Sequence, residues 1–317
     1  MNKTWSLRSL LGIAVVASCT VAFAAWPERT IQYVIAFAPG GESDIAARLQ
    51  AETFKAKFGK EMIVVNKPGA GGGLAWSQMN TTAGDGYTIT GINLPHIVLQ
   101  PLEGTANFKT EDTTPVYWFH YTPDAVIVAA DSPYKSLDDL IRAAKEKPEI
   151  VTFAGSGTNS ANHAAWARFD RDFKVKTTYV PFKGTGDLLS SVLGGHVSAA
   201  MSYSTLAIQQ KGKMRMLAVA SDRRLPQFPD VPTFRELGVD WVDGAYRGIG
   251  VPKSTPPELR KQISDAIDAI NKDPEARRKM FELGFEVTDI GYDQMPKFMK
   301  ERSADYMSSA KLLGLVK

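Results

Sequence analysis

Short apolar runs rich in β-branched residues alternate with longer amphipathic runs along almost the whole chain. The short runs predict strands, and they lie at 31–37, 61–66, 87–93, 124–130, 150–155, 177–182, 198–204, 215–221 and 247–252. The longer runs predict helices, and they lie at 45–58, 136–147, 161–173, 187–195 and 256–272. This alternation predicts an α/β fold with mostly parallel sheets flanked by helices.

Two irregular stretches interrupt the alternation. Residues 101–119 have weak periodicity, and residues 221–238 are rich in proline and charge. The series restarts near Asp124, so we expect a discontinuous outer lobe formed by 25–124 and 229–317, with an inserted lobe formed by 125–228. A cleft between two such lobes is the usual place for a ligand.

The first 24 residues have the pattern of a secretory signal peptide. Lys3 and Arg8 precede a short apolar segment from Leu10 to Val21, and Ala22-Phe23-Ala24 forms a small-x-small cleavage site. The only cysteine, Cys19, lies in a loose lipoprotein box, which makes lipid anchoring the less favoured alternative. Cleavage after Ala24 predicts a secreted chain without cysteine, which excludes disulfides, thiol catalysis and Cys-ligated zinc.

Charge and motifs argue against several classes of function. Loss of Lys3 and Arg8 lowers the 37 basic residues to 35, against 34 acidic ones, so nothing favours nucleic-acid binding. The runs Gly69–Leu74 and Gly155–Ser160 begin like a dinucleotide-binding loop but lack its last glycine. No phosphate-binding loop, nucleophile elbow or metal-binding histidine spacing is present. We therefore expect no enzyme activity, no cofactor and no metal.

Two glycine-containing loops are suited to holding an anion. The segment Ala38–Asp44 follows a predicted strand, and Ser156–Ser160 follows another in the second half of the chain. Backbone N–H groups at a helix start favour a carboxylate. The alternative is that each loop is a tight strand-to-helix turn, with Asp44 and Ser160 as capping residues.

The motifs of the whole chain resemble those of one family, the substrate-binding proteins of tripartite tricarboxylate transporters (the Bug or TctC family). The resemblance is carried by WPERTIQYVIAFAPGGESD, NKPGAGGG, FAGSGTNSANH, VPFKGTGDLLSSVLGGHVSAA, LPQFPDVPTFRELG and VPKSTPPELRKQISDAI. The resemblance implies a two-lobed periplasmic binding protein that closes on a small carboxylate, which is then passed to membrane permease subunits. Two loops are implied to grip the carboxylate, and they comprise Ala38, Pro39, Gly40, Gly41, Glu42, Ser43, Asp44 and Ser156, Gly157, Thr158, Asn159, Ser160.

Further positions are assigned to the ligand site through the same resemblance. They are Asn93, His96, His163, Lys183, Tyr203, Ser204 and Arg247. For His96 the alternative is a structural histidine, and for Lys183 it is a solvated turn charge. Tyr203 and Ser204 end a predicted strand, where ligands of open sheets bind.

Two residues depart from the pattern of the family. Glu42 stands where many members have a small residue, and it either caps a helix or selects the cargo. Arg247 stands where many members have Phe, and it either clamps a second carboxylate or forms an ion pair across the hinge. These residues suggest a dicarboxylate or an aromatic carboxylate. We expect a monomer, and the alternative function is a periplasmic sensor that presents its closed form to a signalling receptor.

Overall fold

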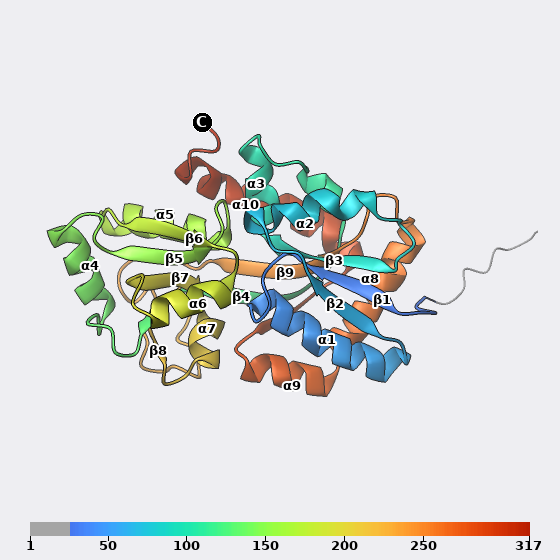
Figure 1. The fold of residues 1–317 in the computed structure, drawn as a ribbon, viewed down its shortest axis with the longest axis horizontal. Helices are drawn as coiled ribbons and strands as arrows, with labels where there is room; N and C mark the ends of the chain where they lie inside the picture. The colour runs from blue at the N-terminus through green and yellow to red at the C-terminus, as the bar shows by residue number, and fades with distance from the viewer. Residues whose placement is uncertain (1–25) are drawn as a thin grey trace, which may run out of the picture.

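The computed structural model describes residues 26–317, so the predicted signal peptide and Cys19 lie outside the described residues (Figure 1). The strands are β1 (Ile31–Ile35), β2 (Met62–Asn66), β3 (Thr88–Leu94), β4 (Pro115–Ala129), β5 (Thr152–Ser156), β6 (Thr178–Phe182), β7 (Ala199–Tyr203), β8 (Met214–Val219), β9 (Gly244–Gly250) and β10 (Glu286–Ile290). The helices are α1 (Glu42–Phe58), α2 (Gly73–Gln78), α3 (His96–Leu102), α4 (Leu137–Glu146), α5 (Ala161–Phe173), α6 (Thr185–Leu193), α7 (Ser204–Gln209), α8 (Pro257–Asn271), α9 (Pro274–Glu282) and α10 (Met295–Leu312).

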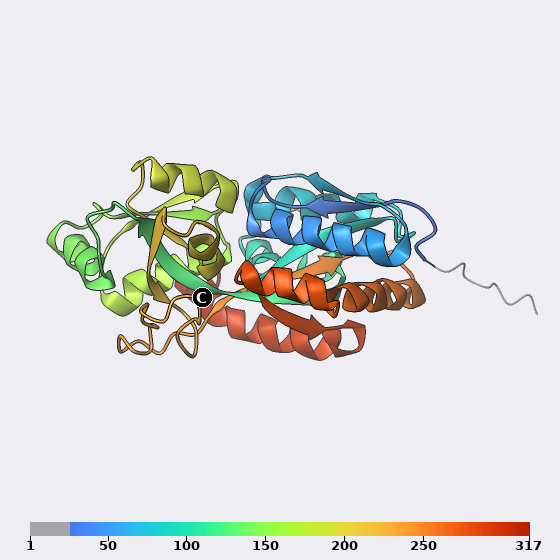
Figure 2. The same cartoon turned by 90° about the horizontal axis from the view of Figure 1, so that it is seen from below.

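Two α/β lobes lie side by side, and the long strand β4 runs through both (Figures 1 and 2). Its first part pairs with β9 and β10 in the outer lobe. From Asp124 onward it pairs with β7 and β8 in the inserted lobe. The first crossing therefore lies at Asp124, inside a single strand.

Each lobe has a mixed sheet in which a group of parallel strands is extended by antiparallel ones. The outer sheet has the order β2-β1-β3-β9-β4-β10, with β1 parallel to both β2 and β3. The inserted sheet has the order β6-β5-β7-β4-β8, in which β4 runs against its two neighbours. The predicted α/β architecture is confirmed, and the antiparallel pairs all involve β4 or β9.

Both faces of each sheet are covered by helices. In the outer lobe, α1, α8 and α9 pack on one face through Phe54, Ile263 and Met280, while α2, α3 and α10 cover the other. In the inserted lobe, α4 and α5 cover one face and α6 and α7 the other. This burial of apolar surface on both sides explains why the strands read as continuous apolar runs.

We propose that the chain returns to the outer lobe later than residue 229. Phe234 and Trp241 are fully buried in the core of the inserted lobe, with their rings stacked 4.2 Å apart. Because these side chains belong to the inserted lobe, we propose the second crossing near Asp243, directly before β9.

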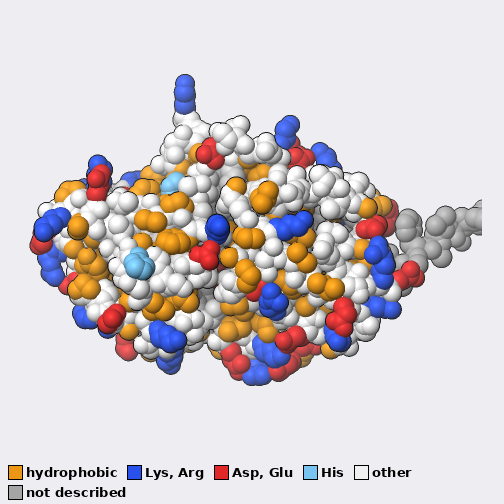
Figure 3. Space-filling model, viewed as in Figure 1, with side chains coloured by type: hydrophobic (Ala, Val, Ile, Leu, Met, Phe, Trp, Pro, Cys, Tyr) orange, Lys and Arg blue, Asp and Glu red, His pale blue; other side chains and the backbone are white. Residues whose placement is uncertain are grey.

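Helix α10 contacts both lobes, since it packs against α3 on one side and α5 on the other. Its residues Tyr306 and Ala310 are buried in a cluster that also contains Ala164 of α5. Of the described helices, none is both long enough and apolar enough to cross a membrane. Basic and acidic side chains are interspersed over the face shown in Figure 3.

Candidate functional site in the interlobe cleft

Two helix starts face each other across the cleft, and neither is capped by a side chain. Helix α1 begins after Gly41 and α6 begins after Gly184, and no side chain accepts a hydrogen bond at either N-cap. A methyl group built on Gly41 would lie 3.7 Å from the backbone nitrogen of Thr185. The unpaired N–H groups and partial positive charges of two helices therefore converge at one point, which suits a carboxylate.

The second predicted loop lies at the same cleft but is largely used for its own structure. Ser156 donates its N–H and its hydroxyl to Oδ1 of Asn162, at 3.0 and 2.6 Å. Ser160 caps α5 by accepting from the N–H of His163 at 3.1 Å. Asn159 donates to Oε2 of Glu103 in the outer lobe at 2.9 Å, so this loop also links the two lobes.

Ten residues line the cleft between these loops: Phe37, Gly41, Glu42, Ser43, Asn93, His96, Ser156, Thr185, Tyr203 and Arg247. The space between them measures about 10 Å³, enough for about one water molecule. The lobes are thus closed in this structure. Entry of any organic carboxylate requires them to separate.

A buried ion pair occupies the wall of the cleft. Arg247 donates to Glu42 and Thr122, and to the carbonyl oxygen of Ala245 at 2.9 Å. The side chains of Glu42 and Arg247 are each 3% exposed. Burial raises the pKa of Glu42 to about 7, although the charge of Arg247 and a hydrogen bond from Thr122 oppose the shift.

This ion pair also reaches the inserted lobe. Thr205, at the start of α7, donates to Glu42. The guanidinium of Arg247 lies 4.2 Å from the centre of the Tyr203 ring. The pair therefore connects helix α1, the crossing strands and the inserted lobe in the closed form.

Asn93 and His96 lie on the outer-lobe side of the cleft. Asn93 donates to the hydroxyl of Ser43 at 3.3 Å. The ring of His96 packs 5.7 Å from that of Phe37, and its Nδ1 has no partner among the described residues. Burial and the nearby Arg247 lower the pKa of His96 to about 3, so the ring is neutral.

Several residues assigned from the sequence lie at the edge of the cleft or outside it. Lys183, Pro39, Gly40 and Thr158 are exposed, and none lines the cavity. His163 stacks on Trp166 with ring centres 5.5 Å apart and accepts from the N–H of Asn159, which gives it a supporting position.

Asp44 holds the shape of the first loop. Its carboxylate accepts from the N–H of Gly40, from Arg48 and from Asn66, all within 3.0 Å. Burial alone would raise the pKa of Asp44, but these hydrogen bonds outweigh it and the pKa lies below the usual value. Its oxygens are occupied by the protein itself.

The sequence reasoning did not find Phe37, Thr185, Thr122 or Thr205. Thr185 directly follows the Lys183-Gly184 turn, and Phe37 directly precedes Ala38, so both adjoin segments that were singled out. Thr122 and Thr205 carried no signal, because threonine in a strand or at a helix start is common without any ligand.

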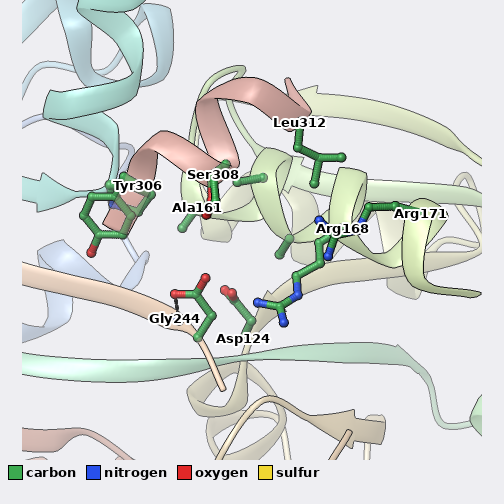
Figure 4. Close-up of a pocket in the computed structure, with 13 residues that line it drawn as sticks. Asp124, Ala161, Arg168, Arg171, Gly244, Tyr306, Ser308 and Leu312 are labelled. Atoms are coloured by element: carbon green, nitrogen blue, oxygen red, sulfur yellow. Dashed lines mark hydrogen bonds between the residues drawn. The ribbon is translucent and has the colours of Figure 1, made fainter. Parts of the chain in front are cut away.

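A separate cavity of about 240 Å³ lies between α5, α10 and the crossing strands (Figure 4). The carboxylate of Asp124 and the guanidinium of Arg168 face it, and Asp243 and Tyr306 also line it. Oδ1 of Asp124 is buried without a partner among the described residues. Burial and then the nearby Asp243 raise the pKa of Asp124 well above its usual value. No group of three or more His, Cys, Asp or Glu side chains suited to a metal occurs in residues 26–317.

Two lobes that share crossing strands and close over a small polar cleft define the fold of a two-lobed periplasmic binding protein. The model of the tripartite tricarboxylate transporter family receptors (TctC) matches residues 46–315. The chain belongs to this family, as its motifs predicted. The family is one of substrate-binding proteins, which confirms the prediction that the protein is not an enzyme.

Known relatives extend over nearly the whole chain. A protein of Cupriavidus necator described as a UPF0065 protein in the gbd 5′ region is 30% identical over 294 residues, covering 92% of this chain and 90% of the relative. The structure of the periplasmic binding protein BugD is 27% identical with a TM-score of 0.85, covering 92% of this chain and 99% of that one. Rhodopseudomonas palustris Rpa4515 with adipate is 26% identical with a TM-score of 0.85, covering 91% and 98%.

Proposed function

We propose that the protein is an extracytoplasmic solute-binding protein that captures a small carboxylate by closure of its lobes. The observation that carries this proposal is the meeting of two uncapped helix starts, those of α1 and α6, across the cleft. The cargo carboxylate accepts hydrogen bonds from both helices at once, and closure follows because only the closed form offers both. The adipate-bound relative supports a carboxylate as the cargo.

The cargo then passes to a membrane permease of the tripartite tricarboxylate type. Membership of the receptor family supports this partner, and the predicted signal peptide supports a periplasmic location. The closed form presents one joint surface made of both lobes. That surface is what a permease distinguishes from the open, empty protein.

A thermal-shift screen tests the capture step. The panel contains hexanoate, adipate, benzoate and terephthalate, with hexanamide and benzamide as uncharged controls. At 100-fold excess over Kd, a ligand that binds only the folded state adds about 2.7 kcal/mol, which corresponds to a rise in Tm of roughly 5 °C or more. We expect at least one carboxylate to give this rise and to be recovered chemically unchanged. If the amides raised the Tm as much as the carboxylates do, the proposal would be contradicted.

A further inference from the structure

The cleft contains one negative and one positive side chain, and they neutralise each other. Among its ten lining residues, Glu42 and Arg247 are the two with charged side chains, because His96 is held neutral. Glu42 opens α1 and Arg247 lies in the middle of β9, so the pair joins two elements that position the carboxylate site.

The groups that face the pair from neighbouring elements add no further charge. Burial lowers the pKa of His120 on β4 and raises that of Tyr203 on β7, which keeps both rings neutral. Asp124 on β4 has a pKa well above its usual value for the same reason. The remaining partners, Thr122 and Thr205, do not titrate.

Most hydrogen-bonding groups of Glu42 and Arg247 are already used by each other and by neighbouring protein groups. Glu42 accepts from Arg247, Thr122 and Thr205. Three of the five N–H donors of Arg247 are used, which leaves one on Nη2 and that of Nε, an atom buried without a partner among the described residues. A second carboxylate on the cargo would have to compete with Glu42 for the guanidinium, inside a space that excludes water.

We propose that Glu42 restricts the cargo to a single carboxylate, with an uncharged opposite end that lies against Phe37 and Tyr203. The first carboxylate is held at the starts of α1 and α6, and Arg247 offers its remaining N–H groups, on Nε and Nη2, to an uncharged oxygen. The proposal rests on the proposed function and refines its substrate class from carboxylates in general to monocarboxylates. Repulsion between Glu42 and a second carboxylate then lowers the binding affinity for dicarboxylates by roughly 100-fold.

Calorimetric titration with matched pairs tests this selectivity. Hexanoate is compared with adipate, and benzoate with terephthalate, at about pH 8.5, where all of these ligands are fully ionised. In each pair that binds, we expect the wild type to favour the monocarboxylate by at least about tenfold. Glu42→Gln keeps the shape of the side chain and removes its charge. The affinity for dicarboxylates should therefore rise at least about tenfold, while the affinity for monocarboxylates should change little.

Two further variants separate charge from packing. Glu42→Asp keeps the charge and should keep the preference for monocarboxylates. The double variant Glu42→Gln, Arg247→Met removes both charges and should keep monocarboxylate binding. Circular dichroism confirms that each variant is folded.

The pH dependence gives a readout that loss of packing would not produce. Between about pH 8.5 and 6.5 Glu42 takes up a proton, since its pKa is raised to about 7, and this frees Arg247. Adipate should therefore bind the wild type more tightly as the pH falls through this range, and Glu42→Gln should show no such change.

The possible failures are distinct. If no carboxylate binds either the wild type or Glu42→Gln, the proposed function itself is wrong. If the wild type binds the dicarboxylate of a pair as tightly as the monocarboxylate, or if Glu42→Gln leaves their ratio unchanged, the role of Glu42 is overturned while the carboxylate-binding function stands.

Discussion

Glu42 and Asp44 stand two positions apart at the start of one helix and have different environments. Asp44 is surrounded by donors, which hold its pKa below the usual value. Glu42 is buried against a single guanidinium and two hydroxyls, and its pKa rises to about 7. Both are first-turn acids, so the helix dipole alone does not decide their chemistry. The surrounding partners do.

Asp124 provides a test of buried charge at the crossing between the lobes. Because its folded-state pKa is raised, the stability linked to this group is fully present below its unfolded pKa and is lost as the pH rises through the folded value. We expect Asp124→Asn to raise the free energy of unfolding at pH 8 by about 1–3 kcal/mol and to flatten its pH dependence above pH 5.

Urea unfolding followed by circular dichroism at several pH values measures this effect. Asp131→Asn, at an exposed position in the same lobe, is the matched control for loss of one carboxylate. Equal pH profiles for the wild type and Asp124→Asn would contradict this prediction, because they would mean that folding does not shift the pKa of Asp124.

Single residues show how far the sequence alone could lead. Gly41, Ser156 and His96 were identified because they lie in loops with a recognisable pattern. The sequence left two roles open for Arg247, and its bond to Glu42 joins residues separated by 205 positions. No local spacing can indicate such a contact. Lys183 was considered because it is charged, but its turn points the side chain to solvent.

At the level of elements, the N-terminal glycines of α1 and α6 have a common consequence. A glycine at the N-cap supplies no side-chain acceptor, so the first N–H groups of each helix stay available to a ligand. By contrast, α4 and α5 are capped by Ser136 and Ser160. Like α2, α3, α7, α8 and α10, the two helices at the proposed carboxylate site have no side-chain cap, but α1 and α6 are the two whose starts meet across the cleft.

Gly186, in the first turn of α6, separates helix stability from lobe closure. A methyl group at this position would lie 2.8 Å from the carbonyl oxygen of Pro39 in the other lobe. Alanine favours a helix over glycine by about 1 kcal/mol, so Gly186→Ala should leave the inserted lobe intact or more stable. It should nevertheless weaken carboxylate binding by at least about tenfold, because closure is obstructed.

Calorimetric titration and urea unfolding together check this prediction. Ser190→Ala, at an exposed position of the same helix, should leave binding unchanged. Unaltered affinity in Gly186→Ala would mean that binding does not need the contact between α6 and the first loop.

The elements that the sequence did not predict are the first part of β4, β10, α10 and the helices α2, α3, α7 and α9. The first part of β4 is buried on both faces and contains Pro115 and Pro123, so it lacks the alternation and composition of a typical strand. Strand β10 is short and partly exposed, and α10 buries only Met295, Tyr306 and Ala310 of its 18 residues. The strongly patterned helices, such as α5, were predicted with their observed bounds.

At the scale of the whole molecule, the backbones of the two lobes come close together at the glycine loops. A methyl group on Gly157 would lie 2.6 Å from the Cα atom of Gly71 in the other lobe. Strand β4 continues through the crossing without a break, and α10 packs on both lobes. Such an arrangement suits a rigid-body rotation about the crossing strands, with the cleft at the moving edge.

The distance between the lobes, measured with and without ligand, tests whether the protein captures a carboxylate by lobe closure. Cys19 is the only cysteine of the sequence, and the substitution Cys19→Ser removes it. In the triple variant Cys19→Ser, Ala56→Cys, Ser190→Cys, spin labels on the two new cysteines report specifically on α1 and α6. Pulsed electron paramagnetic resonance gives the distance distribution before and after addition of the carboxylate with the largest thermal shift. We expect a longer or broader distance distribution without ligand, and a shift to the short distance of the closed form with it. An unchanged distribution at saturating carboxylate would contradict capture by lobe closure.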